Sequence, residues 1–120
     1  WDRKYKNIHV YGASGKEQDH FLGNLHSALQ WQKKLNITFF DEHGQYFFGN
    51  KEIHLSNCLN KTISLLPFPT ATNITTHGLL YPLQNETLTF GTKIGTRNKA
   101  TKKEVDISFE TGELLIFTQH

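Results

Sequence analysis

The sequence predicts an α+β domain in which an N-terminal amphipathic helix packs on an antiparallel β-sheet, or meander, that ends in a C-terminal hairpin. Two observations support this fold class. Between residues 15 and 35, apolar side chains recur every three or four positions, as they do along one face of a helix. From residue 36 onward the period falls to two, and Thr, Ile and Phe replace the helix-forming residues.

Length and composition indicate one domain over residues 1–120. The chain is 37% hydrophobic and contains nine Phe, which is enough to build a core, and 20% charged residues are too few for a disordered tail. The formal net charge of +2 gives no reason by itself to expect nucleic acid or an anionic membrane as a partner. The single cysteine, Cys58, excludes an internal disulfide.

Three segments are expected along the chain. Residues 1–13 should form a lead-in arm with a short alternating stretch. Ser14 and Glu17 have the spacing of a capping box, which predicts that a helix over residues 15–35 starts here. Residues 36–120 form the β-rich head. The helix residues that we expect to face the sheet are Phe21, Leu25 and Leu29.

Alternation marks six short antiparallel strands in the head. Their apolar residues are Ile37/Phe39, Tyr46/Phe48, Ile53/Leu55, Ile63/Leu65, Leu88/Phe90 and Val105/Ile107/Phe109. The stretch EVDISFE, then Thr111 and Gly112, then ELLIFTQ predicts a closing hairpin with glycine at its two-residue turn. The loop that we expect to be most open to solvent covers residues 95–103 (GTRNKATKK).

Catalytic, cofactor-binding and metal-ligating residues are not predicted. Residues 41–44 (DEHG) look reactive, but between two Phe-rich strands they are better explained as a turn. The seven histidines form no metal-binding motif, Cys58 lies in no nucleophile motif, and no phosphate-binding glycine loop occurs. We therefore expect a protein that is not an enzyme and needs no cofactor.

Basic residues cluster near the end of the chain. Clustered cations can grip the phosphates of a nucleic acid, although aromatic side chains for base stacking are not interleaved with them. The candidate contacts to DNA or to a protein partner are Lys93, Arg97, Lys99, Lys102 and Lys103.

The order of elements resembles the globular head of minor pseudopilins from competence and type II secretion systems. HFLGNLHSALQWQKKLNITFFDEHGQYFFGN is similar to their helix-to-strand region, and NITTHGLLYPLQNETLTFGTKI is similar to a β-segment that follows it. VDISFETGELLIF resembles their closing hairpin. The resemblance covers about residues 20–118 in pattern rather than in identity.

This resemblance implies a non-enzymatic minor pilin of a competence (DNA-uptake) or type II secretion filament. Its partners would be other pilin subunits and DNA, and a helix upstream of Trp1 would anchor it in the membrane. It would lie on the cell surface, in a pilus of a low-GC Gram-positive bacterium. The alternative is a secreted, viral or phage surface module that binds protein or glycan through its β face. A small enzyme, with His43 or His77 meeting a carboxylate, is the third hypothesis.

Overall fold

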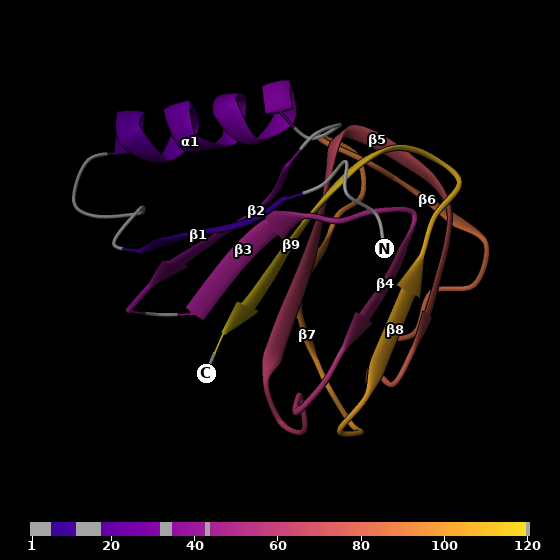
Figure 1. The fold of residues 1–120 in the computed structure, drawn as a ribbon. Coiled ribbons are helices and arrows are strands. Elements are labelled where there is room, and N and C mark those ends of the chain that lie inside the picture. Colours follow the sequence, from indigo (N-terminus) through magenta and orange to yellow (C-terminus); the bar gives the residue numbers. More distant parts are fainter. Residues whose placement is uncertain (1–5, 12–17, 32–34, 43, 120) are drawn as a thin grey trace. The chain divides into compact units, whose positions relative to one another are not determined.

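The computed structural model describes residues 6–11, 18–31, 35–42 and 44–119 (Figure 1). It divides into two compact units, Trp1–Phe48 and Gly49–His120. Each unit has its own strands and its own buried side chains. The organisation of residues 1–120 as a single domain stays a prediction.

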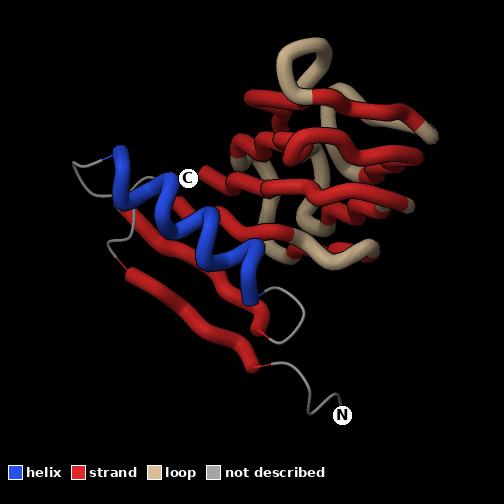
Figure 2. The backbone as a smooth tube through the Cα atoms, turned by 90° about the horizontal axis from the view of Figure 1, so that it is seen from above, coloured by secondary structure: helices blue, strands red, loops and turns tan. Residues whose placement is uncertain are grey.

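The first unit is a β-α-β-β arrangement. Its elements are β1 (Lys6–Tyr11), α1 (Gln18–Trp31), β2 (Leu35–Asp41) and β3 (Gly44–Phe48). Strand β1 pairs with β2 in parallel, with Ile8 opposite Ile37, and β2 pairs with β3 in antiparallel orientation. Parallel neighbours need a crossover connection, and α1 provides it while lying over one face of these strands (Figure 2).

The core of this unit lies between α1 and the strands. Leu25 and Ala28 are buried on the helix. On adjacent strands, the rings of Phe39 and Tyr46 stack with their centroids 4.9 Å apart, and both side chains are buried. The prediction that Leu25 is a core residue is confirmed.

The other predictions for the helix are either wrong or fall on residues that the structure does not describe. Leu29 is only half-buried, and the side chain of Phe21 lies outside the described residues, as do Ser14 and Glu17. The predicted helix end at residue 35 is wrong, because Leu35 already belongs to β2. The alternation that continues through Ile37 and Phe39 starts at Leu35, so this leucine follows the period of the strand.

A tight connection joins Asp41 to Gly44, which confirms the turn that the sequence predicts between these two residues. Asp41 and Gly44 lie opposite each other at the end of the β2–β3 ladder. The backbone N–H of Gly44 donates a hydrogen bond to Oδ1 of Asp41 at 3.1 Å. The aspartate therefore closes a tight connection between two strands. His43 lies outside the described residues.

The second unit is built around one long strand. Its elements are β4 (Glu52–Leu55), β5 (Thr62–His77), β6 (Glu86–Thr89), β7 (Gly95–Lys99), β8 (Val105–Ser108) and β9 (Thr111–Gln119). Strand β5 pairs with β9 along one edge and with β7 and then β6 along the other. Its last residues pair with β8, which in turn pairs with β4. The inward-facing side chains are mostly aliphatic, for example Ile63, Leu65, Ile74, Leu88, Ile107, Leu114 and Ile116.

The predicted C-terminal hairpin is wrong. Strands β8 and β9 do not pair with each other but follow one another along β5, with Ser108 opposite Thr75 and Thr111 opposite Thr72. Gly112 is needed for a different reason than a hairpin turn. It has a φ of 90° at an irregular point of the β5–β9 ladder, where a Cβ would clash with the carbonyl oxygen of Thr70.

The predicted fold class is also wrong. The protein is mostly β, and the one helix among the described residues crosses over between two parallel strands. Residues 6–11, expected to be part of an arm, form β1, and residues 95–99, expected to be in an exposed loop, form β7. Alternation identified most strands, but it contains no information on which strand pairs with which.

Replacing Gly112 with alanine should destabilise the chain by about 3 kcal/mol or more, because the new Cβ combines a positive φ with a backbone clash. Gly23→Ala is the matched control. Gly23 lies within α1 with nothing within 4 Å of a built Cβ, so this change should stabilise by up to about 1 kcal/mol. Urea unfolding of both variants measures the difference, and equal stabilities would contradict the close approach at Gly112.

Candidate functional site

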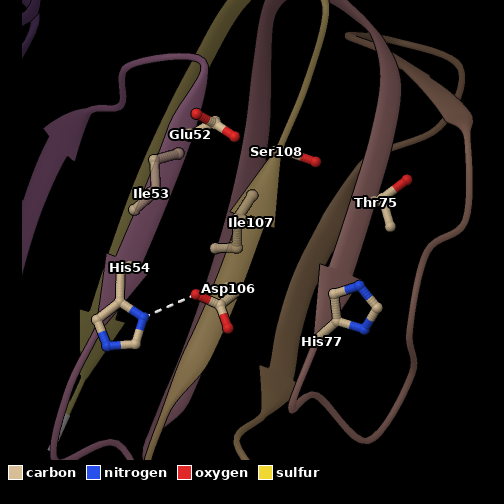
Figure 3. Close-up of a pocket in the computed structure, with 8 residues that line it drawn as sticks. All are labelled: Glu52, Ile53, His54, Thr75, His77, Asp106, Ile107 and Ser108. Carbon is tan, nitrogen blue, oxygen red and sulfur yellow. Dashed lines mark hydrogen bonds and ion pairs between the residues drawn. The ribbon is translucent and has the colours of Figure 1, made fainter.

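An open hollow of about 470 Å³ lies on the exposed face of β4, β8 and the end of β5 (Figure 3). Strand register places its polar side chains in two rows. In one row Asp106 lies between His54 and His77, and in the other Ser108 lies between Glu52 and Thr75. The rows follow from the period of two, since every second residue of each strand faces outward.

His54 is the most strongly engaged group in the hollow. Its Nδ1 lies 2.7 Å from Oδ1 of Asp106 (Figure 3). Its Nε2 lies 3.5 Å from Oε1 of Glu104. The hydrogen bond to Asp106 raises the pKa of His54 above its ordinary value of 6.5. Because the His54 side chain is 54% exposed, water screens this pair strongly.

The hollow does not form a metal centre within the described part of the chain. No three of its histidine and carboxylate groups converge closely enough to hold an ion, and the same is true of the other described residues. Cys58 is buried elsewhere in this unit, where its thiol donates to the carbonyl of Ser56 and burial raises its pKa. A buried thiol with a raised pKa is a poor nucleophile.

A second surface is the loop of residues 78–85, whose two ends are held by hydrogen bonds. At one end, the N–H of Leu80 donates to the carbonyl of Lys99 at 2.8 Å. At the other, Leu83 bonds twice to Thr76, with its N–H donating to Oγ1 and its carbonyl accepting from the Thr76 N–H, both at 2.9 Å. The middle of the loop is therefore held in place although its side chains are exposed.

The buried side chain of Asn98 holds the middle of this loop. Its Nδ2 donates to the carbonyl of Tyr81 at 2.7 Å, and its Oδ1 accepts from the N–H of Tyr81 at 3.0 Å. Oδ1 also accepts from the N–H of Lys99 at 2.9 Å. An amide that bonds both backbone groups of one residue acts like a neighbouring strand. We call Leu80, Tyr81, Arg97 and Asn98 the Asn98 corner.

The corner displays apolar surface on a fixed backbone. Leu80 is 50% exposed and Tyr81 is 67% exposed, although both are large side chains that gain from burial. An exposed ring on an immobilised backbone is ready to stack on a planar ligand.

The five predicted contact residues are spread over three segments. Lys93 precedes β7 and forms an ion pair with Glu86 at 2.6 Å. Arg97 and Lys99 belong to β7, and Lys102 and Lys103 lie in the connection to β8. That these five contact a partner stays a prediction, and only Arg97 lies in the Asn98 corner.

Sequence reasoning missed Asn98 and Tyr81. The two residues are 17 positions apart, and Asn98 lay in a stretch read as an exposed loop. No alternation marks the strand over residues 95–99, because Thr96 and Arg97 are both exposed where the register against β5 shifts.

Asp106→Asn should lower the pKa of His54, because the hydrogen bond that favours the charged imidazole is weakened. Glu104→Gln should lower it less, since the contact to Glu104 is longer. Because the pKa of His54 is higher in the folded state, its pair with Asp106 stabilises the fold below about pH 6.5. This contribution to stability is lost as the pH rises through the folded-state pKa. NMR titration of the His54 ring measures the shifts, and an unchanged midpoint in Asp106→Asn would contradict the pairing.

The family model and the curated relative that match this chain point to the same family. Residues 50–114, more than half of the chain, match the family described as thiamin pyrophosphokinase, vitamin B1 binding domain. Thiamine pyrophosphokinase of Bacillus subtilis is 30% identical over 114 residues, which cover 91% of this chain and 53% of that protein.

Solved structures agree with this match. The crystal structure of thiamine pyrophosphokinase from Bacillus subtilis aligns with a TM-score of 0.85 at 25% identity, over 94% of this chain and 55% of that one. The enzyme from Geobacillus thermodenitrificans gives 0.84 at 22% identity, over 96% and 54%. That from Candida albicans gives 0.84 at 16%, over 94% and 43%, so these last two show the fold alone. The chain spans about half the length of these relatives.

These findings overturn the pilin interpretation and what it implied. The resemblance to minor pseudopilins is wrong, and so are the expected roles in competence, DNA uptake and type II secretion, with pilin subunits and DNA as partners. The alternative of a surface recognition module is not supported either.

The expectation of a non-enzymatic protein is wrong too, because the matching family is a domain of an enzyme. The predicted location on the cell surface, in an anchored pilus, is wrong as well, because it followed from the pilin assignment. Among the described residues, no helix has the length and apolar character needed to span a membrane.

The helix-to-strand order that suggested a pilin belongs instead to the β1-α1-β2 crossover, and the supposed closing hairpin belongs to the ladder along β5. Since the family model covers more than half of the chain and the folds agree, this chain belongs to the thiamin pyrophosphokinase family, through its vitamin B1 binding domain.

Proposed function

We propose that this chain binds thiamin at the Asn98 corner. The observation that carries the proposal is the position of the corner: Tyr81 and Asn98 both lie inside residues 50–114, the segment that matches the vitamin B1 binding domain. Within that segment, Asn98 holds the backbone of Tyr81 from both sides and leaves its ring exposed.

The chemistry of thiamin suits this corner. The vitamin consists of an aminopyrimidine ring joined to a positively charged thiazolium ring. The face of Tyr81 offers an electron-rich surface for either ring, and a cation over an aromatic face gains about 0.5–2 kcal/mol. Because the loop backbone is already fixed, binding costs little additional ordering.

The hollow is a less suitable place for the vitamin. Its carboxylates, Glu52 and Asp106, attract cations, but Asp106 already interacts with His54. None of the eight residues that line the hollow is aromatic apart from the two histidines. A flat, cationic ligand would therefore find charge there but little ring surface.

The name of the family denotes the transfer of a pyrophosphoryl group to thiamin. We propose that this chain supplies the part of such an enzyme that holds the vitamin, whose own hydroxyl is the attacking group. A part with this role needs no nucleophile of its own, which fits the buried, unreactive environment of Cys58.

Tyr81→Ala should weaken thiamin binding about tenfold, which corresponds to roughly 1.4 kcal/mol of lost ring contact. Tyr81→Phe keeps the ring and should bind within about twofold of the unmodified chain. Isothermal titration calorimetry with thiamin measures all three affinities. The loss in Tyr81→Ala with retention in Tyr81→Phe is the expected pattern.

Two further variants locate the site. Phe90→Ala removes another exposed ring, which lies next to Thr89, opposite Thr70 of β5, whereas Asn98 lies opposite Ile63. Phe90 lies outside the Asn98 corner, so thiamin affinity should not change. Asp106→Asn tests the hollow. If that change weakens binding and Tyr81→Ala does not, the vitamin occupies the hollow and the assignment to the Asn98 corner is wrong.

A further inference from the structure

Two consecutive residues of β5, Thr75 and Thr76, hold the second end of the loop of residues 78–85. Neighbouring residues of a strand point to opposite faces, so the two hydroxyls lie on opposite sides of β5. Thr76 is buried, whereas Thr75 is half-buried and lines the hollow (Figure 3). Both hydroxyls are nevertheless bonded to the same short part of the loop, residues 83–85.

Thr76 bonds the loop from the inner face of β5. Its backbone N–H donates to the carbonyl of Leu83, which extends the β5–β6 edge beyond the pair of Ile74 and Glu86. Its Oγ1 accepts from the N–H of Leu83 at 2.9 Å. An N–H that loses its partner in a partly buried position is costly, so the Thr76 hydroxyl fixes the backbone of Leu83.

Thr75 bonds the loop from the outer face. Its Oγ1 donates to Oδ1 of Asn85 at 3.3 Å and accepts from the backbone N–H of Asn85 at 3.1 Å. Asn85 has a φ of 50°, in the left-handed region that asparagine adopts more readily than most residues. The next residue, Glu86, begins β6. The Thr75 hydroxyl therefore holds the residue at which the loop passes into the strand.

The first end of the loop is held through backbone groups. The N–H of Leu80 donates to the carbonyl of Lys99, and the N–H of Thr101 donates to the carbonyl of Gly78, both at 2.8 Å. Almost any residue can make such bonds, because every backbone carries the same groups. At the second end two side-chain hydroxyls take part, so the position of that end depends on the residue types at 75 and 76. Tyr81 lies between the two ends.

We infer that Thr75 and Thr76 are positioning residues for the vitamin site. Their hydroxyls keep the loop in the arrangement that presents the Tyr81 ring, and both are already bonded to the loop rather than free for a ligand. This inference rests on the proposed function, because the loop carries the proposed thiamin-binding ring. Loops have low local stability, so losing a bond at one end populates other loop arrangements. The apparent affinity falls with the fraction of molecules whose loop is competent to bind.

The test measures thiamin affinity by titration calorimetry on the full chain. Thr75→Val and Thr76→Val each replace a hydroxyl by a methyl group and should weaken binding about two- to fivefold, and the double variant about tenfold. Thr76→Ser keeps the hydroxyl but removes a buried methyl group, so it should lower the unfolding midpoint and leave affinity within about twofold. Thr89→Val is the matched control, a half-buried threonine of β6 whose bonds to Lys93 are made by backbone groups. Its affinity should not change.

Amide hydrogen exchange gives a second readout that needs no ligand. The N–H groups of Leu83 and Asn85 should exchange faster in the valine variants, because each loses its hydroxyl acceptor. The N–H of Tyr81 should exchange faster in the double variant, since the second end of the loop is then released. All three rates should stay unchanged in Thr89→Val.

The outcomes separate this inference from the proposed function. If the unmodified chain does not bind thiamin, the proposed function fails and the inference fails with it. If it binds thiamin and the valine variants bind equally well, only the inference fails. If affinity follows the unfolding midpoint across all variants, Thr76→Ser included, the threonines act through general stability and the inference is wrong. If affinity falls while the Tyr81 exchange rate stays the same, the hydroxyls contact the ligand directly and the inference is wrong. Weaker binding together with faster exchange, confined to the valine variants at positions 75 and 76, supports it.

Discussion

The second unit depends on one constraint, the pairing of β5 along both of its edges. A strand whose two edges are hydrogen-bonded must direct its side chains alternately to the two faces, and β5 buries Ile63, Leu65 and Pro67 on one of them. Its partners β6, β7, β8 and β9 are short or interrupted strands that β5 holds in register. The positions of both candidate surfaces follow from this one strand.

Irregularities in the β5 ladders create the special features of the unit. Where β9 departs from regular register, Gly112 allows the backbones to approach. Where β7 departs, the extra residue is Arg97, and its N–H bonds to Ser64. In the first case the irregularity serves packing alone. In the second it places a cation beside Asn98, a buried side chain whose amide oxygen and nitrogen both have hydrogen-bond partners within the unit.

The two candidate surfaces differ in how their polar groups are used. In the hollow, His54 and Asp106 bond to each other on an exposed face, so that water and the partner already satisfy much of their charge. At the Asn98 corner, the amide atoms of Asn98 are already hydrogen-bonded to the backbone of Tyr81. The groups that remain for a ligand are the ring of Tyr81 and the guanidinium of Arg97. A bound ring thus gains contact area without displacing an internal ion pair.

The sequence by itself determined the features that depend on neighbouring residues. The alternation of Ile37 with Phe39 predicted a strand, residues 41–44 predicted a turn, and the helical period predicted that Leu25 is buried. Only the tertiary structure decided the parallel pairing of β1 with β2, the course of β8 and β9 along β5, and the hydrogen bonds between Asn98 and Tyr81. The physical reason is that backbone hydrogen-bonding groups are the same in every residue, so local periodicity shows that a strand exists but not which distant strand or loop satisfies it.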